Sequence, residues 1–402
     1  MNRKLIITKL NNRIITTVFE NDEAVEIHCA NQETDCVVAL GNIYIGKVKN
    51  IVGNIGAAFV EIANGVECYY SIEENKSPIF THKVGTRPLC IGDELIVQIS
   101  KEAIKTKAPT VTGKLSFTGK YAVLTSGDTR IGASTKLQRE ERERLTALAK
   151  EFTSQEYGII MRTNAKDVDE DILRHEIKML VGEYRNVMKA GETRVCFSCL
   201  KKAPAKYLTD LKNINQEGLT DIIIEDVELY EDTKAYLDNY QPEDLKKLRY
   251  YQDKLLPLHK LYSIEKLVEN ALKERVWLKS GAYLVIQPTE ALTVIDVNTG
   301  KCIDKKWDNK AYLTINKEAA REVAKQIRLR NLTGIILIDF INLSEQAYME
   351  ELLAFFEKEL RKDPIATTLV DVTKLQLVEV TRKKIRKPFH ESMDFNNGGN
   401  NK

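Results

Sequence analysis

Runs of apolar residues separated by polar turn residues dominate the first third of the chain and predict a series of β-strands. The first two runs, residues 5–7 and 14–19, flank the pair Asn11-Asn12, which predicts a hairpin turn. From about residue 38 to residue 117, short strands follow one another closely with turn residues between them. Close spacing of short strands favours a small barrel of the oligonucleotide-binding type.

Apolar residues at helical spacing appear in the middle of the chain. Residues 137–152 and 169–188 are predicted helices that flank a short strand at residues 158–161. A further helix is predicted after Ser263, whose hydroxyl is expected to cap the first turn.

The most informative pattern is a pair of apolar strands that each carry an acidic residue near the end. Residues 292–298 contain Asp296 and residues 334–340 contain Asp339, and a predicted helix at about 316–331 lies between the two strands. A strand, a helix and a second strand form a βαβ-like unit, so the two strands are expected to be parallel neighbours. Their carboxyl ends would then place Asp296 and Asp339 side by side.

Two carboxylates at one edge of a sheet are costly unless a cation or a proton lies between them. Mg²⁺ suits such a pair, because it takes oxygen ligands, keeps several waters and completes its shell with substrate phosphate. Asn298 shares a strand face with Asp296 and is expected to orient it or to bind a metal-bound water. The alternative is that both acids cap neighbouring helices or bind nothing. Asp371 also ends an apolar run, and the sequence leaves open whether it is a third ligand.

Aromatic and basic residues suggest where nucleic acid would bind. In the predicted barrel, aromatic side chains facing solvent would stack on bases, with lysines beside them for phosphates. These residues are Tyr44, Phe59, Tyr69, Tyr70, Lys101, Lys105 and Lys107. The alternative is that most of the aromatic side chains fill the barrel core. A second basic cluster at residues 382–387 is either a solvated face or a surface that touches an RNA backbone.

Composition and charge indicate the class of protein and limit how it could bind nucleic acid. The chain has 402 residues, of which 43% are hydrophobic and 29% charged, as in globular proteins. The 60 basic and 58 acidic residues rule out a simple polybasic binder, so a nucleic-acid surface must come from local clustering. An odd number of cysteines, seven, argues for a reducing compartment, and Cys196 and Cys199 are expected to be ordinary thiols. With no apparent signal peptide and no apolar membrane span, the sequence predicts a cytoplasmic protein.

Several long segments, in the same order along the chain, resemble the ribonuclease E/G family. Near the acidic strands these are TEALTVIDVNTGK (289–301), QIRLRNLTGIILIDFINL (326–343) and DVTKLQLVEVTRKK (371–384). GNIYIGKVKNIVGNIGAAFVEI (41–62) and VQISKEAIKTK (97–107) resemble the RNA-binding barrel of that family, and GIIMRTNA (158–165) resembles its phosphate-sensing segment. The similarity extends from about residue 1 to residue 392.

The resemblance implies an α+β multidomain fold. Residues 1–37 and 214–279 would form an RNase-H-like domain with a structural role. Into it are inserted an RNA-binding barrel of the OB type at residues 38–118 and a 5′-sensor domain at residues 119–213. A DNase-I-like α/β catalytic domain would follow at residues 280–390, and residues 391–402 are expected to be a disordered tail.

The resemblance also implies an activity. Members of the family are endoribonucleases that hydrolyse single-stranded RNA with Mg²⁺, leaving 5′-phosphate and 3′-hydroxyl ends, in the processing and decay of rRNA and mRNA. Mn²⁺ is expected to substitute for Mg²⁺. By motif, Asp296 and Asp339 would hold the metal and Asn298 would support the catalytic site. The other carried-over positions are Gly119, Val123, Arg162 and Thr163 for a 5′-monophosphate, and Phe59, Tyr69, Lys107 and Arg330 for RNA.

Departures from the family pattern bear on assembly. The family usually carries a Cys-Pro-x-Cys pair after the catalytic domain that shares zinc between subunits, and no cysteine follows Cys302 here. A structural zinc is therefore not expected, and any homo-oligomer would form without the usual zinc link. Other departures are Ala108 and Thr110 in the link after the barrel, Asn342 in place of an acid, and Gln376 in place of a glycine. A protein that keeps the fold and binds RNA without cleaving it is the alternative function, and a metal phosphoesterase acting on DNA or small phosphates is a third.

Overall fold

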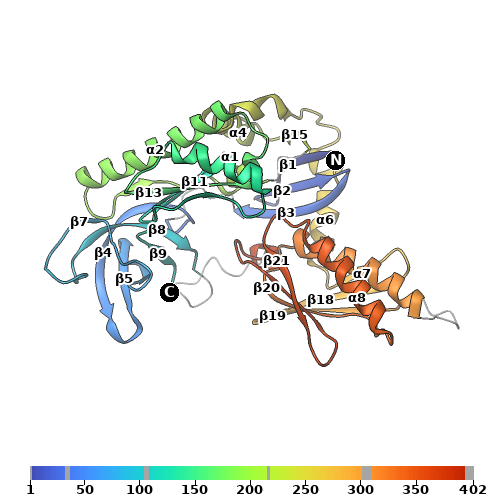
Figure 1. Cartoon of the computed structure of the whole chain (residues 1–402). Coiled ribbons are helices and arrows are strands. Elements are labelled where there is room, and N and C mark those ends of the chain that lie inside the picture. The colour runs from blue at the N-terminus through green and yellow to red at the C-terminus, as the bar shows by residue number, and fades with distance from the viewer. Residues whose placement is uncertain (1, 32–36, 104–107, 215–217, 301–308, 394–402) are drawn as a thin grey trace. The chain divides into compact units, whose positions relative to one another are not determined.

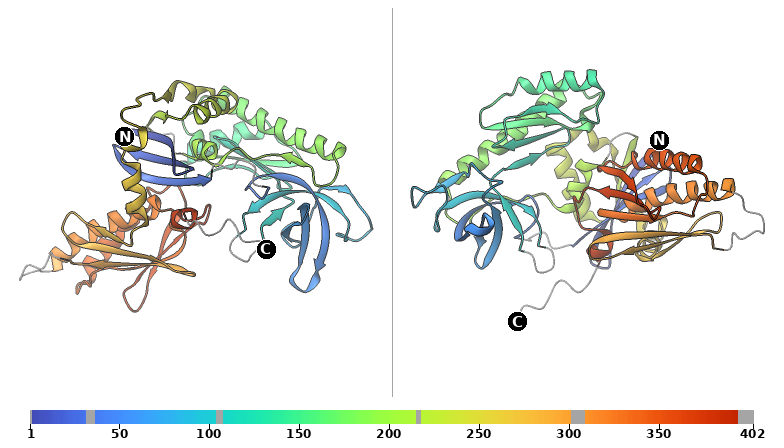
Figure 2. Two further views of the ribbon diagram at one scale, coloured as in Figure 1. Left: turned by 180° about the vertical axis from the view of Figure 1, so that it is seen from behind. Right: turned by 60° about the horizontal axis from the view of Figure 1, so that its bottom comes forward.

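The computed structural model describes residues 2–31, 37–103, 108–214, 218–300 and 309–393 of a mixed α/β protein. The chain forms two compact units (Figures 1 and 2). The first comprises Met1–Gln32, Asn215–Leu237 and Glu243–Lys402, and the second comprises Glu33–Ile214 and Asp238–Pro242. None of the helices in the described ranges is both long and apolar enough to cross a membrane.

One sheet of the first unit is built on the N-terminal strands. Its strand order is β16 (Leu248–Tyr250), β15 (Leu219–Ile224), β1 (Arg3–Leu10), β2 (Arg13–Glu20) and β3 (Glu23–Asn31). Asn11 and Asn12 both have positive φ between β1 and β2, which confirms the predicted hairpin turn.

Helices of the same unit pack near this sheet, and two expectations about them were wrong. The helices are α4 (Val227–Tyr240), the 3-10 helix η3 (Pro242–Lys247), α5 (Leu258–Leu261), α6 (Ile264–Leu272) and α9 (Phe389–Met393). Ser263 precedes α6 with φ 50° and its side chain makes no capping hydrogen bond, because a capping residue needs extended backbone. Residues 391–393, expected in the tail, form the end of α9, which Phe389 anchors by its burial at 2% exposure. Residues 394–402 lie outside the described part.

The second sheet of this unit carries the acidic strands. Its order is β17 (Arg275–Trp277), β18 (Tyr283–Pro288), β19 (Leu292–Asn298), β20 (Gly334–Asp339), β22 (Val378–Arg382) and β21 (Thr367–Val372). Strands β19 and β20 are parallel, as predicted, and the helix between them, α7 (Asn309–Leu329), begins earlier than expected. Helices α7 and α8 (Gln346–Leu360) cover one face of the sheet, where the apolar core lies (Figure 1).

In the second unit, five strands close into the expected barrel. Its circuit is β4 (Ile43–Val52), β5 (Ala57–Ala63), β6 (Val66–Ser71), β9 (Thr110–Thr112) and β8 (Glu94–Lys101), with β8 pairing again with β4. The short strands β7 (Phe80–His82) and β14 (Cys199–Lys201) extend it, and the 3-10 helix η1 (Gly53–Ile55) joins β4 to β5.

The remaining sheet of the second unit is small. Its order is β10 (Ser116–Thr118), β11 (Ala122–Ser126), β13 (Tyr157–Met161) and β12 (Ile131–Ala133). The helices that accompany it are α1 (Arg139–Lys150), the 3-10 helix η2 (Thr163–Ala165), α2 (Glu170–Thr193) and α3 (Lys206–Asn213). The predicted helices at 137–152 and 169–188 correspond to α1 and α2, and the Asp169 side chain caps α2 by accepting from the Asp171 amide.

Candidate active site

Asp296 and Asp339 are direct neighbours at the carboxyl ends of two parallel strands. They are register partners in the β19–β20 ladder. Adjacent strands lie about 4.8 Å apart, and partners in a ladder point to the same face of the sheet. Along β19, Thr293, Ile295 and Val297 are buried under the helices, so Asp296 projects from the opposite face. The expected juxtaposition of the two acids is therefore present.

Asn298 orients the first of these carboxylates. Its Nδ2 donates a hydrogen bond of 2.7 Å to Oδ2 of Asp296, and both side chains are half-buried. The Asp339 side chain is exposed at the surface. The protein atoms around its carboxyl group partly exclude water, and this burial, together with the negative charge of Asp296, raises its pKa above the ordinary value. Burial and a neighbouring like charge both disfavour the charged form of a carboxyl group.

The donor set fits a hard divalent cation. Two carboxylates meet at one edge, and the Asn298 carbonyl is available to orient a bound water because its amide nitrogen faces Asp296. Within the described residues no group of three or more acidic, histidine or cysteine side chains could hold a metal ion. Water and a substrate oxygen would therefore fill the remaining positions, as Mg²⁺ allows. Asp371 lies on β21, which β22 separates from β20, so it does not join the pair.

A polar pocket of about 460 Å³ follows directly after β20. Its lining includes Asn342 and Gln376, two of the residues that depart from the family pattern, together with Asn309, Leu343, Ser344, Lys374 and Leu375. Asn316, fully buried in α7, holds this loop: its Nδ2 donates to the Ile341 carbonyl at 2.7 Å and its Oδ1 accepts from the Ile341 amide at 3.0 Å. The backbone after Asp339 is therefore fixed by a residue on the covering helix.

The barrel divides the four candidate aromatic residues into two groups. Tyr44 and Tyr70 are buried in the core, at 6% and 1% exposure, so the stacking interpretation is wrong for them. Phe59 and Tyr69 are half-buried register partners on β5 and β6, with ring centroids 6.4 Å apart in an edge-to-face arrangement. This second pair presents aromatic surface at the barrel wall. Lys105 and Lys107 lie outside the described residues, and Lys101 is exposed.

Arg162 and Thr163 lie at the end of β13, beside the turn that contains Gly119. The Arg162 guanidinium donates to the Gly119 carbonyl at 2.6 Å and to Oδ1 of Asn213 at 2.8 Å. Thr163 is exposed and its hydroxyl contacts that of Ser134 at 3.1 Å. Val123 is half-buried on β11, next to this turn. The four predicted phosphate-binding positions therefore come from one corner of the small sheet.

Glu176 organises this corner, and the sequence alone did not single it out. Its buried carboxylate accepts hydrogen bonds from the amides of Lys120, Tyr121 and Ala122 at 2.9, 2.7 and 2.8 Å. Burial raises its pKa, and these three bonds and the charge of Arg162 oppose that rise. A glutamate on an otherwise apolar helix face was the available signal, but its partners are more than 50 residues away.

Two basic residues with predicted or suggested RNA contacts are instead buried. Arg330 is 5% exposed and donates to Gln326 Oε1 at 2.6 Å and to the Lys273 carbonyl at 2.6 Å. Arg382, in the second basic cluster, is 4% exposed and pairs with Asp363 at 2.7 Å. Both guanidiniums bond within the protein, so neither belongs to an RNA-binding surface in this conformation.

The chain is similar to known ribonucleases. The model of the Ribonuclease E/G family matches residues 116–385. Ribonuclease G of Haemophilus influenzae is 31% identical over 372 residues, covering 90% of this chain and 75% of that protein. Ribonuclease G of Salmonella typhimurium is 32% identical, with 90% and 76% covered. Ribonuclease E of a Nostoc species is 30% identical over 94% of this chain and 55% of its own length.

Proposed function

The chain belongs to the ribonuclease E/G family, and we propose that it is an endoribonuclease that hydrolyses single-stranded RNA with a Mg²⁺ ion held by Asp296 and Asp339. The observation that carries the proposal is the register pairing of these two acids at the carboxyl ends of β19 and β20. The hydrogen bond from Asn298 and the raised pKa of Asp339 support it.

The protein's own residues would prepare the site for the ion and the substrate. Asp296 and Asp339 supply two negative oxygens on one face, and Asn298 fixes the rotamer of Asp296. A bound Mg²⁺ would lower the pKa of a water and neutralise charge on the phosphodiester. In the hydrolysis, a water oxygen would form a bond to phosphorus while the bond between phosphorus and the 3′ oxygen breaks and that oxygen takes up a proton. One product then carries a 5′-phosphate and the other a 3′-hydroxyl.

The other unit would select and orient the RNA. Phe59 and Tyr69 offer aromatic edges and faces on which unpaired bases stack. Arg162 and Thr163 supply a guanidinium and a hydroxyl for a terminal 5′-monophosphate, the donor types that suit that group. To bind it, Arg162 would exchange at least one of its bonds to Gly119 and Asn213 for phosphate oxygens. Val123 and Gly119 contribute the backbone of the same corner.

We propose that this activity serves the processing and decay of rRNA and mRNA. We also propose that the chain has the domains implied by the resemblance: an RNase-H-like domain, an RNA-binding barrel, a 5′-sensor domain and a DNase-I-like catalytic domain. Mn²⁺ is proposed as a substitute ion. If the chain forms a homo-oligomer, the segment after Cys302 supplies no cysteine for a zinc link.

A cleavage assay on matched RNA and DNA tests the proposal. An end-labelled single-stranded oligoribonucleotide should be cut internally in the presence of Mg²⁺ and left intact with EDTA, and its products should carry 5′-phosphates. The DNA of the same sequence should stay intact. RNA binding without cleavage under any divalent ion would favour the alternative of a non-catalytic RNA-binding protein, and equal cleavage of the DNA would favour a general phosphoesterase.

A further inference from the structure

An aromatic and cationic surface lies on the same open sheet face as the two acids. Trp277 on β17 pairs with Tyr283 on β18, and Tyr283 pairs with Asn298 on β19. One step along these strands, Arg275 pairs with Val285, and Val285 pairs with Asp296. Because partners across a sheet point to the same side, these side chains continue the row that ends in Asp339. We refer to Arg275, Trp277 and Tyr283 as the β17–β18 ledge.

The three side chains of the ledge contact one another, with the planes of the two rings tilted by 56°. The Trp277 and Tyr283 rings are 5.1 Å apart, and the Arg275 guanidinium lies 4.5 Å from the Tyr283 ring centre and 5.8 Å from that of Trp277. Trp277 nevertheless remains 55% exposed. No carboxylate within the described part of the chain forms an ion pair with Arg275. A large exposed ring beside an unneutralised guanidinium is typical of surfaces that bind single-stranded nucleic acid.

The ledge is fixed with respect to the acidic residues. Gly300 follows Asn298 with φ +59°, and a Cβ there would lie 2.4 Å from the Gly281 carbonyl and 3.2 Å from the Tyr283 ring. The turn that leaves β19 therefore packs directly against the aromatic ring. Strand spacing puts β17 about 10 Å from β19, roughly two strand separations. A base on the ledge would belong to a nucleotide close to the phosphate held between Asp296 and Asp339.

We propose that the β17–β18 ledge is a base-stacking subsite, in which Trp277 stacks on one unpaired base of the RNA and Arg275 contacts a neighbouring phosphate. The proposal rests on the proposed endoribonuclease function and adds to it a residue that holds an unpaired base near the cleaved bond. Stacking tolerates any base but not the loss of the base, so the subsite requires an unpaired nucleotide at this position and disfavours a duplex.

An abasic scan of the substrate tests the subsite. A single abasic nucleotide is moved stepwise through the positions that flank one cleavage site, and kcat/KM is measured for each oligoribonucleotide. In the wild-type protein, removing one base near the cleaved bond should lower kcat/KM roughly 5- to 100-fold, the range of base–aromatic stacking. Trp277→Ala should lower cleavage of the intact RNA by a similar factor and should abolish the response to that abasic position, whereas Trp277→Phe should retain most of it.

Controls separate this subsite from folding and from the proposed function itself. Leu255, 96% exposed in the segment after β16, provides the matched surface variant Leu255→Ala, which should behave as wild type. Trp277→Ala should unfold at the wild-type temperature, because its side chain is largely outside the core. An abasic profile that is the same in Trp277→Ala and wild type would overturn the subsite while leaving the nuclease intact.

If the wild-type protein does not cleave RNA, the proposed function fails, and a binding measurement still decides on the ledge. An oligoribonucleotide with 2-aminopurine at successive positions is bound in EDTA, and its fluorescence should be quenched at one position in wild type and not in Trp277→Ala. Equal quenching in both proteins at every position would reject the subsite.

Discussion

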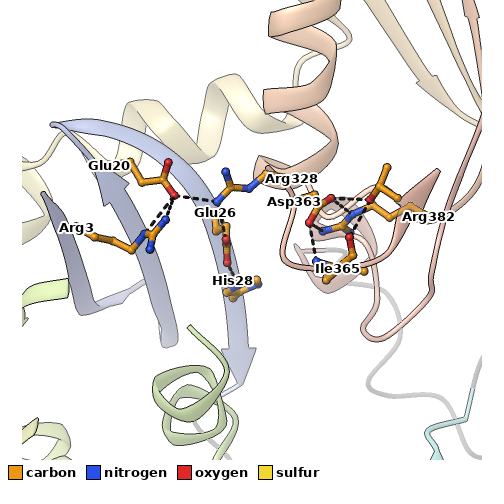
Figure 3. A network of polar contacts seen from close by, with 9 residues as sticks. Arg3, Glu20, Glu26, His28, Arg328, Asp363, Ile365 and Arg382 are labelled. Carbon is orange, nitrogen blue, oxygen red and sulfur yellow. Dashed lines mark hydrogen bonds and ion pairs between the residues drawn. The ribbon is translucent and has the colours of Figure 1, made fainter. Parts of the chain in front are cut away.

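Removing the Arg328 guanidinium should destabilise the unit that carries the acidic strands. In Figure 3, Arg328 of α7 reaches the acidic residues of β2 and β3, donating to Glu20 at 3.0 Å and to Glu26 at 2.9 Å. The three side chains are only 11%, 10% and 19% exposed. Breaking a buried ion pair by removing one partner costs about 3–5 kcal/mol. Glu20 keeps Arg3 at 2.6 Å and Glu26 keeps His28 at 3.7 Å, so Arg328→Met should cost about 3 kcal/mol.

The pH dependence of this cost has a defined sign. Burial by itself would raise the pKa of Glu26, but the interactions with His28 and with the Arg328 charge bring it below its usual range. A lowered folded-state pKa contributes stability that is complete above the unfolded value, near 4.5, and is lost as the pH falls below it. Without Arg328, burial has a larger influence and Glu26 becomes easier to protonate. The cost of Arg328→Met should therefore be largest at pH 7 and shrink toward pH 4.

Urea unfolding followed by tryptophan fluorescence measures the cost, since Trp277 belongs to this unit. The matched control is Arg361→Met, which removes an arginine from an exposed helical pair with Glu357 at 2.8 Å. That pair should be worth less than about 1 kcal/mol at any pH. A cost for Arg328→Met that equals the control and does not change between pH 7 and pH 4 would refute the reasoning.

Three further predictions concern the unit that contains the barrel and the loop after β21. Arg162→Ala should lower the cleavage rate of 5′-monophosphorylated RNA roughly 10- to 100-fold, which is the factor expected from lost charge-assisted hydrogen bonds. The rate on 5′-hydroxyl RNA should fall far less, and equal losses on both substrates would exclude the sensing role. Phe59→Ala or Tyr69→Ala should each weaken the Kd for a single-stranded oligoribonucleotide roughly 5- to 100-fold in a filter-binding assay, and an unchanged Kd would exclude stacking there. Gln376 has φ +65°, so Gln376→Gly should raise the free energy of unfolding by about 1 kcal/mol, whereas Leu375→Gly in the same loop should lower it; a loss of stability in both variants would contradict this explanation.

Local patterns predicted the acidic edge because two periodicities determine it. Alternation along β19 and β20 and helical spacing in α7 require a βαβ unit, and parallel strands then place Asp296 beside Asp339. Closure of the barrel was also predictable. Five short strands with turns between them would otherwise leave the backbone amides and carbonyls of two edge strands without hydrogen-bond partners, and closing the barrel pairs them.

Charged residues could not be assigned from the sequence, because their partners are distant along the chain. Arg382 is buried and pairs with Asp363, and Arg330 donates a hydrogen bond to a carbonyl 57 residues earlier. Both arginines lie in basic segments whose sequence predicts exposed side chains. The role of Glu176 is hidden in the sequence for the same reason, because the three amides that donate to it are 54–56 residues away. Backbone conformation explains why the predicted cap at Ser263 is wrong. Ser263 has a left-handed φ, and the residue types around it do not indicate this conformation.

We propose that Asp296 and Asp339 act through one shared divalent ion, and the dependence of cleavage on free Mg²⁺ tests this most directly. Initial rates on a 5′-monophosphorylated oligoribonucleotide should rise and saturate with Mg²⁺ in the wild-type protein. Asp296→Asn and Asp339→Asn should each lose cleavage at every Mg²⁺ concentration while binding the RNA with nearly the wild-type Kd. Cleavage that needs no divalent ion, or wild-type rates in either variant, would contradict the claim.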